Sequence, residues 1–228
     1  FQKDCGKIHA DEVLTILNAK SISDTGKDLD GQTFPTYIQG IGGQSVVLTY
    51  LMSLSMKLFG YTLFAARLPS LIISIISMIV LYDLIKKITK NKNIALIGLA
   101  ILAISPWHIL QSMWCWDCNM FPHFLLFAID ILYNAILKNK RIMIYISMVF
   151  FGITLYCYGV AIYFVPLFLI IQAVYLLKEK KIKPLDVIIS IIIFLVLSLP
   201  IILTFAINAF KIDIDLKIFN ITIPYYKN

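Results

Sequence analysis

Charged residues are scarce in this sequence. They make up 14% of the 228 residues, whereas a soluble domain usually carries about a quarter. Hydrophobic residues account for 60% of the chain, and the mean hydropathy is +0.85. This composition excludes an ordinary soluble domain and indicates an integral membrane protein.

Cysteine is also sparse. The chain has four cysteines, Cys5, Cys115, Cys118 and Cys157, and they are too scattered to form a disulfide scaffold. The pair Cys115-x-x-Cys118 has no second pair that could complete a zinc ribbon and no thioredoxin-like surroundings. We therefore expect unpaired thiols, and the sequence offers no ligand set for a divalent metal.

The net charge of +7 does not indicate a nucleic-acid partner, because the lysines fall between apolar runs instead of along one surface. Apolar windows of about 17 to 25 residues can cross a bilayer as helices. Six such windows predict an all-α polytopic helix bundle: 68–85, 94–110, 120–137, 142–158, 162–177 and 185–206. Since the chain begins at Phe1 without a signal peptide, we also expect it to be a fragment of a longer protein with a preceding span.

Basic residues alternate between the links that join these windows. The links 86–93, 138–141 and 178–183 hold 11 of the 20 basic residues, whereas 111–119 has none. Cytoplasmic loops of membrane proteins are enriched in lysine and arginine. The pattern therefore predicts that residues 1–67 form an outer loop, that 68–206 form the bundle, and that 207–228 begin the next outer loop.

The apolar segment 44–60 does not fit this alternation as a further span. If it crossed the bilayer, either the acidic N-terminal segment or the lysine-rich links would lie on the wrong side. It is also short and carries Lys57 near its end. We therefore expect an interfacial or re-entrant helix.

Residues 9–20, HADEVLTILNAK, form an acidic stretch before the apolar runs. A helical projection places Val13, Leu14, Ile16 and Leu17 on one face. It groups Asp11 with Thr15 and Asn18 on the opposite face, with Glu12 at the edge. We expect a helix on the membrane surface that presents Asp11 to water or to a crevice, although two acids in a first helical turn can also simply favour the helix dipole.

Several other acids are open to more than one interpretation. Asp28-x-Asp30-Gly31 resembles part of a calcium loop, but Gly26 and Tyr37 occupy the positions where that loop needs acids. A turn is the better interpretation. Asp130 lies inside a predicted span, where a charge should face the interior of the bundle.

The link 111–119 is polar and lies on the same predicted side as Asp11. Asp117 and Asn119 are its side chains of interest. They could serve a site there or simply cap the following helix.

Three stretches in a fixed order resemble a known family. They are HADEVLTILNAKSISDTGKDLDGQTFP, KLFGYTLFAARLPSLI and LAISPWHILQS. Together they are similar to the N-terminal half of bacterial protein-O-mannosyltransferases and aminoarabinose-transferase-like enzymes of the glycosyltransferase C superfamily. The resemblance covers roughly residues 9–225, and the order of the motifs is more specific than any one of them.

The resemblance implies a polytopic enzyme of a bacterial plasma membrane with its site on the extracytoplasmic side. It implies a polyprenyl-phosphate-linked sugar as donor, a protein, glycan or lipid acceptor, contact with membrane lipid, and inversion at the sugar. Asp11 would be the catalytic base, with Glu12 assisting or structural, and Arg67 would contact the donor phosphate. A single base can suffice because a phosphate leaves without protonation, whereas a sugar alkoxide does not.

The sequence also departs from the family pattern. Gln44 is the nearest residue to an acidic and basic motif that aminoarabinose-type relatives carry, and Met113 replaces an arginine that many relatives have. Gln44, Asp117 and Asn119 are therefore only possible substrate-binding residues, and the metal requirement stays open. The alternative is a non-enzymatic transporter or assembly scaffold with a degraded site.

Overall fold

The computed structural model describes residues 9–39, 43–212, 216–218, 221–223 and 225. In these ranges the chain is almost entirely helical, and one short antiparallel hairpin follows the last helix. The predicted all-α membrane bundle is confirmed. Cys5 lies outside the described residues.

The elements follow one another as short-linked helices. In chain order they are α1 (Ala10–Thr25), α2 (Val46–Phe59), α3 (Leu63–Thr89), α4 (Lys92–Ile104), α5 (Pro106–Met113), a 3₁₀ turn (Asp117–Asn119), α6 (Met120–Leu137), α7 (Arg141–Thr154), α8 (Ala161–Lys178), α9 (Pro184–Ala209), β1 (Leu216–Ile218) and β2 (Ile221–Ile223).

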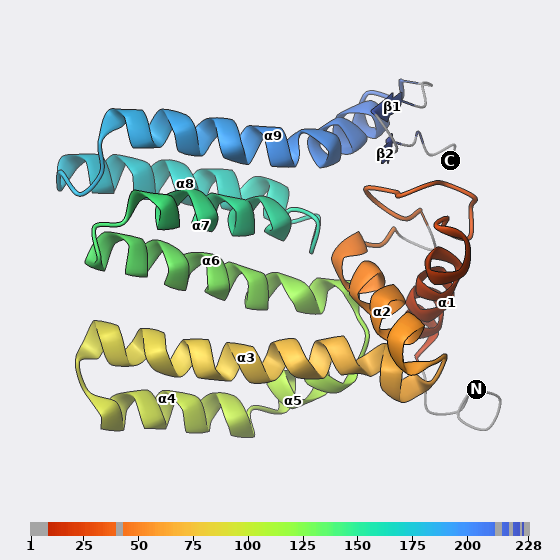
Figure 1. Ribbon diagram of the computed structural model, residues 1–228, viewed down its shortest axis with the longest axis horizontal. Coiled ribbons are helices and arrows are strands. Elements are labelled where there is room, and N and C mark those ends of the chain that lie inside the picture. Colours follow the sequence, from red (N-terminus) through yellow and green to blue (C-terminus); the bar gives the residue numbers. More distant parts are fainter. Residues whose placement is uncertain (1–8, 40–42, 213–215, 219–220, 224, 226–228) are drawn as a thin grey trace.

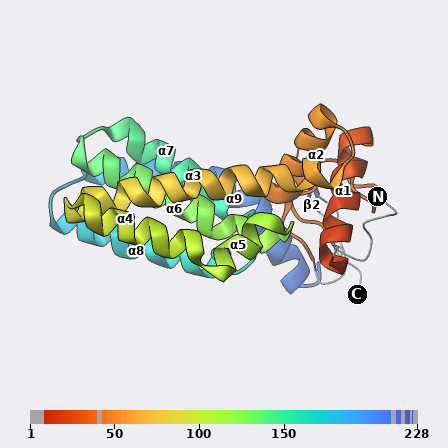
Figure 2. The same cartoon turned by 90° about the horizontal axis from the view of Figure 1, so that it is seen from below.

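The long apolar helices lie side by side, and α1 and α2 cross one end of the bundle (Figure 1 and Figure 2). Four helices in the described chain are long and apolar enough to cross a membrane, and they include α3, α8 and α9. The fourth runs from Asp117 through α6 to Leu137. The predicted windows thus correspond to real helices, with two exceptions.

The first exception is the window 94–110, which is not one straight helix. It consists of α4 and α5, which meet at an angle of 59°. The break falls at Ser105, whose ψ of 118° is extended. Pro106 follows, and a proline disfavours the helical conformation of the residue before it and lacks an N–H for the helix ladder. The bent pair is either one broken span or a re-entrant loop.

The second exception is the window 142–158, where α7 has 14 residues. At 1.5 Å per residue it is roughly 21 Å long, shorter than a typical hydrocarbon core of about 30 Å. The helix ends at Thr154, and residues 155–157 form turns. Tyr156 in that turn donates to the carbonyl of Leu197 at 2.7 Å, which fastens this end of α7 to α9.

The three lysine-rich connections lie together at the end of the bundle that is farthest from α1 and α2 (Figure 1). They are the α3–α4, α6–α7 and α8–α9 connections, and we call this end the lysine end. The opposite end, which carries α1, α2 and the link 111–119, is called the α1 end. Which side of the membrane each end faces stays a prediction from the lysine pattern.

Asp130 is paired inside the bundle, between α6 and α3. Lys87 Nζ lies 3.3 Å from Asp130 Oδ1 and also pairs with Asp83. Asn134 Nδ2 donates to Asp130 Oδ2 at 2.9 Å. Asp130 is thus a structural acid toward the lysine end, away from the candidate site.

Replacing Lys87 by methionine is expected to destabilise the bundle by about 2 kcal/mol, because a carboxylate inside an apolar bundle then loses its cation. Thermal unfolding in detergent measures the change. Lys86→Met is the matched control, since the Lys86 ammonium lies over the Tyr82 ring at 6.0 Å instead of pairing with Asp130. Equal losses in the two variants would contradict the assigned role of Lys87.

Candidate active site

The start of α1 is fixed by His9. Its Nδ1 accepts a hydrogen bond from the backbone N–H of Asp11 at 3.4 Å, as a helix N-cap does. The helix ends at Gly26, whose φ of 73° requires the left-handed conformation that glycine adopts readily. Between these caps the adjacent acids diverge: the Asp11 side chain is 60% exposed and the Glu12 side chain is 0% exposed.

The wet face predicted for α1 is correct for the exposed Asp11 but wrong for Thr15 and Asn18. Thr15 and Asn18, expected beside Asp11 in water, are each 1% exposed, whereas Leu17 from the expected apolar face is 44% exposed. The reason is that α1 packs on α2 and on its own following loop. Asn18 Oδ1 accepts from the Leu29 N–H at 3.1 Å, so this polar face forms hydrogen bonds with the loop instead of facing solvent.

Glu12 joins three parts of the chain. Its carboxylate accepts two hydrogen bonds from Arg67 of α3, from Nε at 2.7 Å and from Nη2 at 2.8 Å. It also accepts from the Cys115 backbone N–H in the link 111–119 at 3.4 Å. A two-pronged pair of this kind is among the stronger polar contacts in proteins. It fixes α1, and with it Asp11, relative to the end of the bundle.

Cys115 lies in the same buried junction and is 0% exposed. Burial, together with the Glu12 carboxylate beside it, raises the pKa of the Cys115 thiol. A thiol in this state is a poor nucleophile and a poor metal ligand. The prediction of unpaired thiols agrees with the free Cys115, Cys118 and Cys157 in the structure.

Asp11 opens into a polar crevice of about 250 Å³ at the α1 end. The residues that line this polar crevice are Asp11, Thr15, Gly43, Gln44, Trp116, Asp117 and Cys118. They come from α1, from the segment before α2 and from the link 111–119. Three of the predicted site residues, Asp11, Gln44 and Asp117, are therefore brought together although they are far apart in the sequence.

Gln44 forms one wall of the polar crevice. Its Nε2 donates to Thr15 Oγ1 at 3.1 Å and to the Asp11 carbonyl at 3.4 Å. Its Oε1 is buried and has no hydrogen-bond partner among the described residues. Gly43 precedes it at a φ of 77°, and a Cβ there would overlap the Tyr37 ring. Only glycine suits that position without strain.

Trp116 gives the polar crevice an aromatic wall. Its ring contacts His9 edge-on at a centroid distance of 5.4 Å and Trp114 at 5.1 Å. The indole N–H of Trp116 is buried and likewise has no hydrogen-bond partner in the described chain. Buried polar groups usually find a protein, water or ligand partner. Two residues that line the polar crevice, Gln44 and Trp116, thus each keep one buried polar atom without a partner among the described residues, close to the exposed Asp11 carboxylate.

Asp117 connects the link 111–119 to α2. Its Oδ2 accepts from the Ser45 backbone N–H at 2.7 Å. The Ser45 hydroxyl itself makes no cap hydrogen bond to α2. Asp117, from a distant part of the chain, therefore accepts a hydrogen bond from a backbone N–H at the start of α2. Its carboxylate also interacts favourably with the positive end of the helix dipole.

Replacing Asp117 by alanine is expected to cost about 1–3 kcal/mol, because the Ser45 N–H is left without its acceptor. Asp117→Asn keeps an acceptor oxygen of the same shape and should lose much less. Thermal unfolding of the two variants in detergent compares them. If Asp117→Asn and Asp117→Ala destabilise the protein equally, the hydrogen bond to Ser45 is not the source of the stability that Asp117 contributes.

The other predicted residues lie behind the polar crevice. Asn119 is 0% exposed, and its Nδ2 donates to the carbonyls of Gln111 at 3.2 Å and Trp114 at 3.0 Å. It closes the link 111–119 on itself. Arg67 and Glu12 do not line the polar crevice, and they pair with each other beside it. Among the described residues no group of three or more His, Cys, Asp or Glu side chains is placed to hold a metal ion.

The sequence is matched by one family model, described as dolichyl-phosphate-mannose-protein mannosyltransferase, over residues 44–204. This range is more than half of the chain. The chain belongs to this family. Membership places it among glycosyltransferase C-like membrane enzymes that use polyprenyl-phosphate sugar donors. No curated protein and no solved structure gives a significant match to the chain.

The family match includes part of the site. Gln44, Arg67, Asp117 and Asn119 lie inside the matched range, whereas Asp11 and Glu12 precede it. Sequence reasoning missed Gly43, Trp116 and Cys118 as lining residues, and it placed Thr15 beside Asp11 without assigning it to the site. Trp116 had a usable signal, because it is an aromatic residue next to a polar candidate. Gly43 had none without knowledge of the Tyr37 contact.

Proposed function

We propose that this chain carries the site at which a sugar moves from a polyprenyl-phosphate donor to an acceptor hydroxyl on the extracytoplasmic side. The observation that carries the proposal is the exposed Asp11 carboxylate in a polar crevice at one end of an apolar helix bundle. The donor's lipid tail can remain in the bilayer beside the apolar helices while its sugar reaches the end of the bundle. Family membership supports the choice of donor.

In the proposed reaction Asp11 is the general base. Its carboxylate takes the proton of the acceptor hydroxyl as that oxygen attacks the anomeric carbon of the sugar. The bond from this carbon to the phosphate oxygen breaks, and the bonding electrons leave with the phosphate. Because a phosphate is a stable anion near neutral pH, no acid is needed to protonate it, and one carboxylate suffices. Attack opposite the leaving group inverts the anomeric centre.

The remaining lining groups orient the reactants. Gln44 Oε1 and the Trp116 N–H are buried and unpaired among the described residues, and a small shift of either side chain would let it bond a hydroxyl of the sugar or of the acceptor. The Glu12–Arg67 pair acts indirectly, because it positions α1. A contact between Arg67 and the donor phosphate stays a proposal, since two of its nitrogens are engaged with Glu12.

The test is transfer from a radiolabelled polyprenyl-phosphate sugar by vesicles that contain the protein, with mannose as the first sugar because of the family description. Label is expected to leave the lipid fraction and to enter an acceptor. Vesicles without the protein are the control. If the lipid-linked sugar stays intact with every sugar supplied, or only crosses the membrane, the protein is a scaffold or a transporter.

A further inference from the structure

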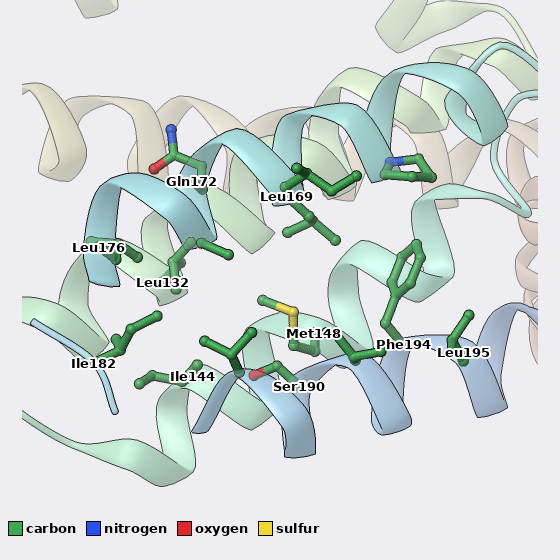
Figure 3. Close-up of a pocket in the computed structure, with 15 residues that line it drawn as sticks. Leu132, Ile144, Met148, Leu169, Gln172, Leu176, Ile182, Ser190, Phe194 and Leu195 are labelled. Carbon is green, nitrogen blue, oxygen red and sulfur yellow. The ribbon is translucent and has the colours of Figure 1, made fainter. Parts of the chain in front are cut away.

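A second cavity lies far from the polar crevice, at the lysine end of the bundle. It has a volume of about 320 Å³ and lies between α8 and the helices α6, α7 and α9 (Figure 3). Its walls are apolar side chains that include Leu132, Met148, Leu169 and Phe194. The volume is at the lower limit for small-molecule pockets, roughly 300 Å³, which suits one hydrocarbon chain better than a whole lipid.

One polar group is buried in this apolar wall. Ser190 of α9 is 8% exposed, lines the cavity, and its hydroxyl has no hydrogen-bond partner among the described residues. Ser198 in the same helix donates to the Phe194 carbonyl at 2.7 Å, as serines in apolar helices commonly do. Ser190 lies six residues after the start of α9, which is roughly 9 Å from the lysine end. The apolar cavity therefore has one buried hydroxyl in its wall that is unpaired among the described residues.

The α8–α9 connection that borders the cavity is basic. Ile182 of the α8–α9 connection lines the cavity, and it lies between Lys181 and Lys183. The connection 178–183 carries four lysines against one acid, Glu179. The nearby Asp186 is 2% exposed and already accepts from Tyr145 and from the Lys183 backbone N–H. The lysine side chains of this connection are exposed, and none of them pairs with a carboxylate among the described residues.

We propose that this cavity holds one acyl chain of an anionic phospholipid, with its phosphate at Lys181 and Lys183 and its chain passing Ser190. The apolar wall fits the chain, and the lysines select the negative headgroup. Basic pockets between membrane helices bind anionic headgroups by the same complementarity. The site is separate from the proposed donor site, because the two share no described lining residue and the cavity lies among α6, α7, α8 and α9.

Native mass spectrometry of the protein, released from nanodiscs that contain equal amounts of phosphatidylglycerol and phosphatidylcholine, tests this site. The wild type is expected to retain one phosphatidylglycerol in preference to phosphatidylcholine. Lys181→Gln/Lys183→Gln should retain it roughly tenfold less, because each lysine near an anionic headgroup contributes several-fold to affinity. Ala173→Phe places a ring in the cavity and should abolish retention.

Lys90→Gln/Lys92→Gln is the matched control, since it removes the same charge from the α3–α4 connection at the same end. Retention there should equal that of the wild type. Equal loss in this control, no preference over phosphatidylcholine, or full retention in Ala173→Phe would each overturn the site. If Ala173→Phe does not fold, the comparison between the two lysine pairs decides alone, because both pairs are exposed.

Discussion

Replacing Asp11 by asparagine is expected to slow sugar transfer by about 10²–10⁴-fold, the usual contribution of a general base. Asparagine has the same shape as aspartate but cannot take the proton of the acceptor hydroxyl. Because the Asp11 side chain is 60% exposed and does not hold another helix in place, the variant should fold normally. The measurement is kcat for transfer from a labelled lipid-linked sugar, with KM for the donor determined alongside.

Asp24→Asn is the matched control for this experiment. Asp24 is an exposed acid on the same helix and pairs with Lys20 at 2.8 Å, outside the polar crevice. Its loss should leave kcat unchanged. Transfer at the wild-type rate by the Asp11→Asn variant would remove Asp11 from the mechanism.

Replacing Arg67 by methionine is expected to destabilise the protein by about 3 kcal/mol, the lower part of the range for breaking a buried ion pair. The lower part applies because the Arg67 side chain is 23% exposed, whereas Glu12, which is left unpaired, is 0% exposed. Combining Arg67→Met with Glu12→Leu should recover most of the loss, since no buried charge then remains. Thermal unfolding in detergent gives the double-mutant cycle.

The same double variant separates the two roles of Arg67. If Arg67 only positions α1, the stabilised double variant keeps a normal KM for the donor. If its guanidinium also contacts the donor phosphate, KM rises although the protein is folded. Additive losses of stability in the cycle, with no recovery, would contradict the assigned pair.

The bundle could be predicted well because apolar runs and lysine-rich links depend only on local composition. Each predicted window contains a helix or a helix pair. The window 94–110 was predicted as one span because it is apolar throughout, and Pro106 indicated an interruption near its outer end but not a bend of 59° at Ser105. The true start of α3 at Leu63, five residues before the window, follows from Thr62, whose hydroxyl caps the helix by accepting from the Ala65 N–H.

The candidate site could be predicted only in part. The different surroundings of the Asp11 and Glu12 side chains follow from their adjacency on a helix, since neighbouring side chains point about 100° apart. The burial of Thr15 could not be predicted, because a helical projection assumes that water or lipid surrounds α1. In the structure Gln44 and α2 cover that face. The Glu12–Arg67 contact joins residues 55 positions apart, and no local pattern encodes it.

Photocrosslinking with a lipid-linked sugar that carries a photoreactive group on the sugar tests whether the donor sugar binds in the polar crevice. The wild type is expected to be labelled within residues 9–15 and 114–118, and excess unlabelled donor should prevent this labelling. Asp11→Asn should be labelled equally, because it binds the donor without transferring the sugar. Labelling at the lysine end within 178–195, or labelling that excess donor does not reduce, would show that the sugar does not bind in the polar crevice.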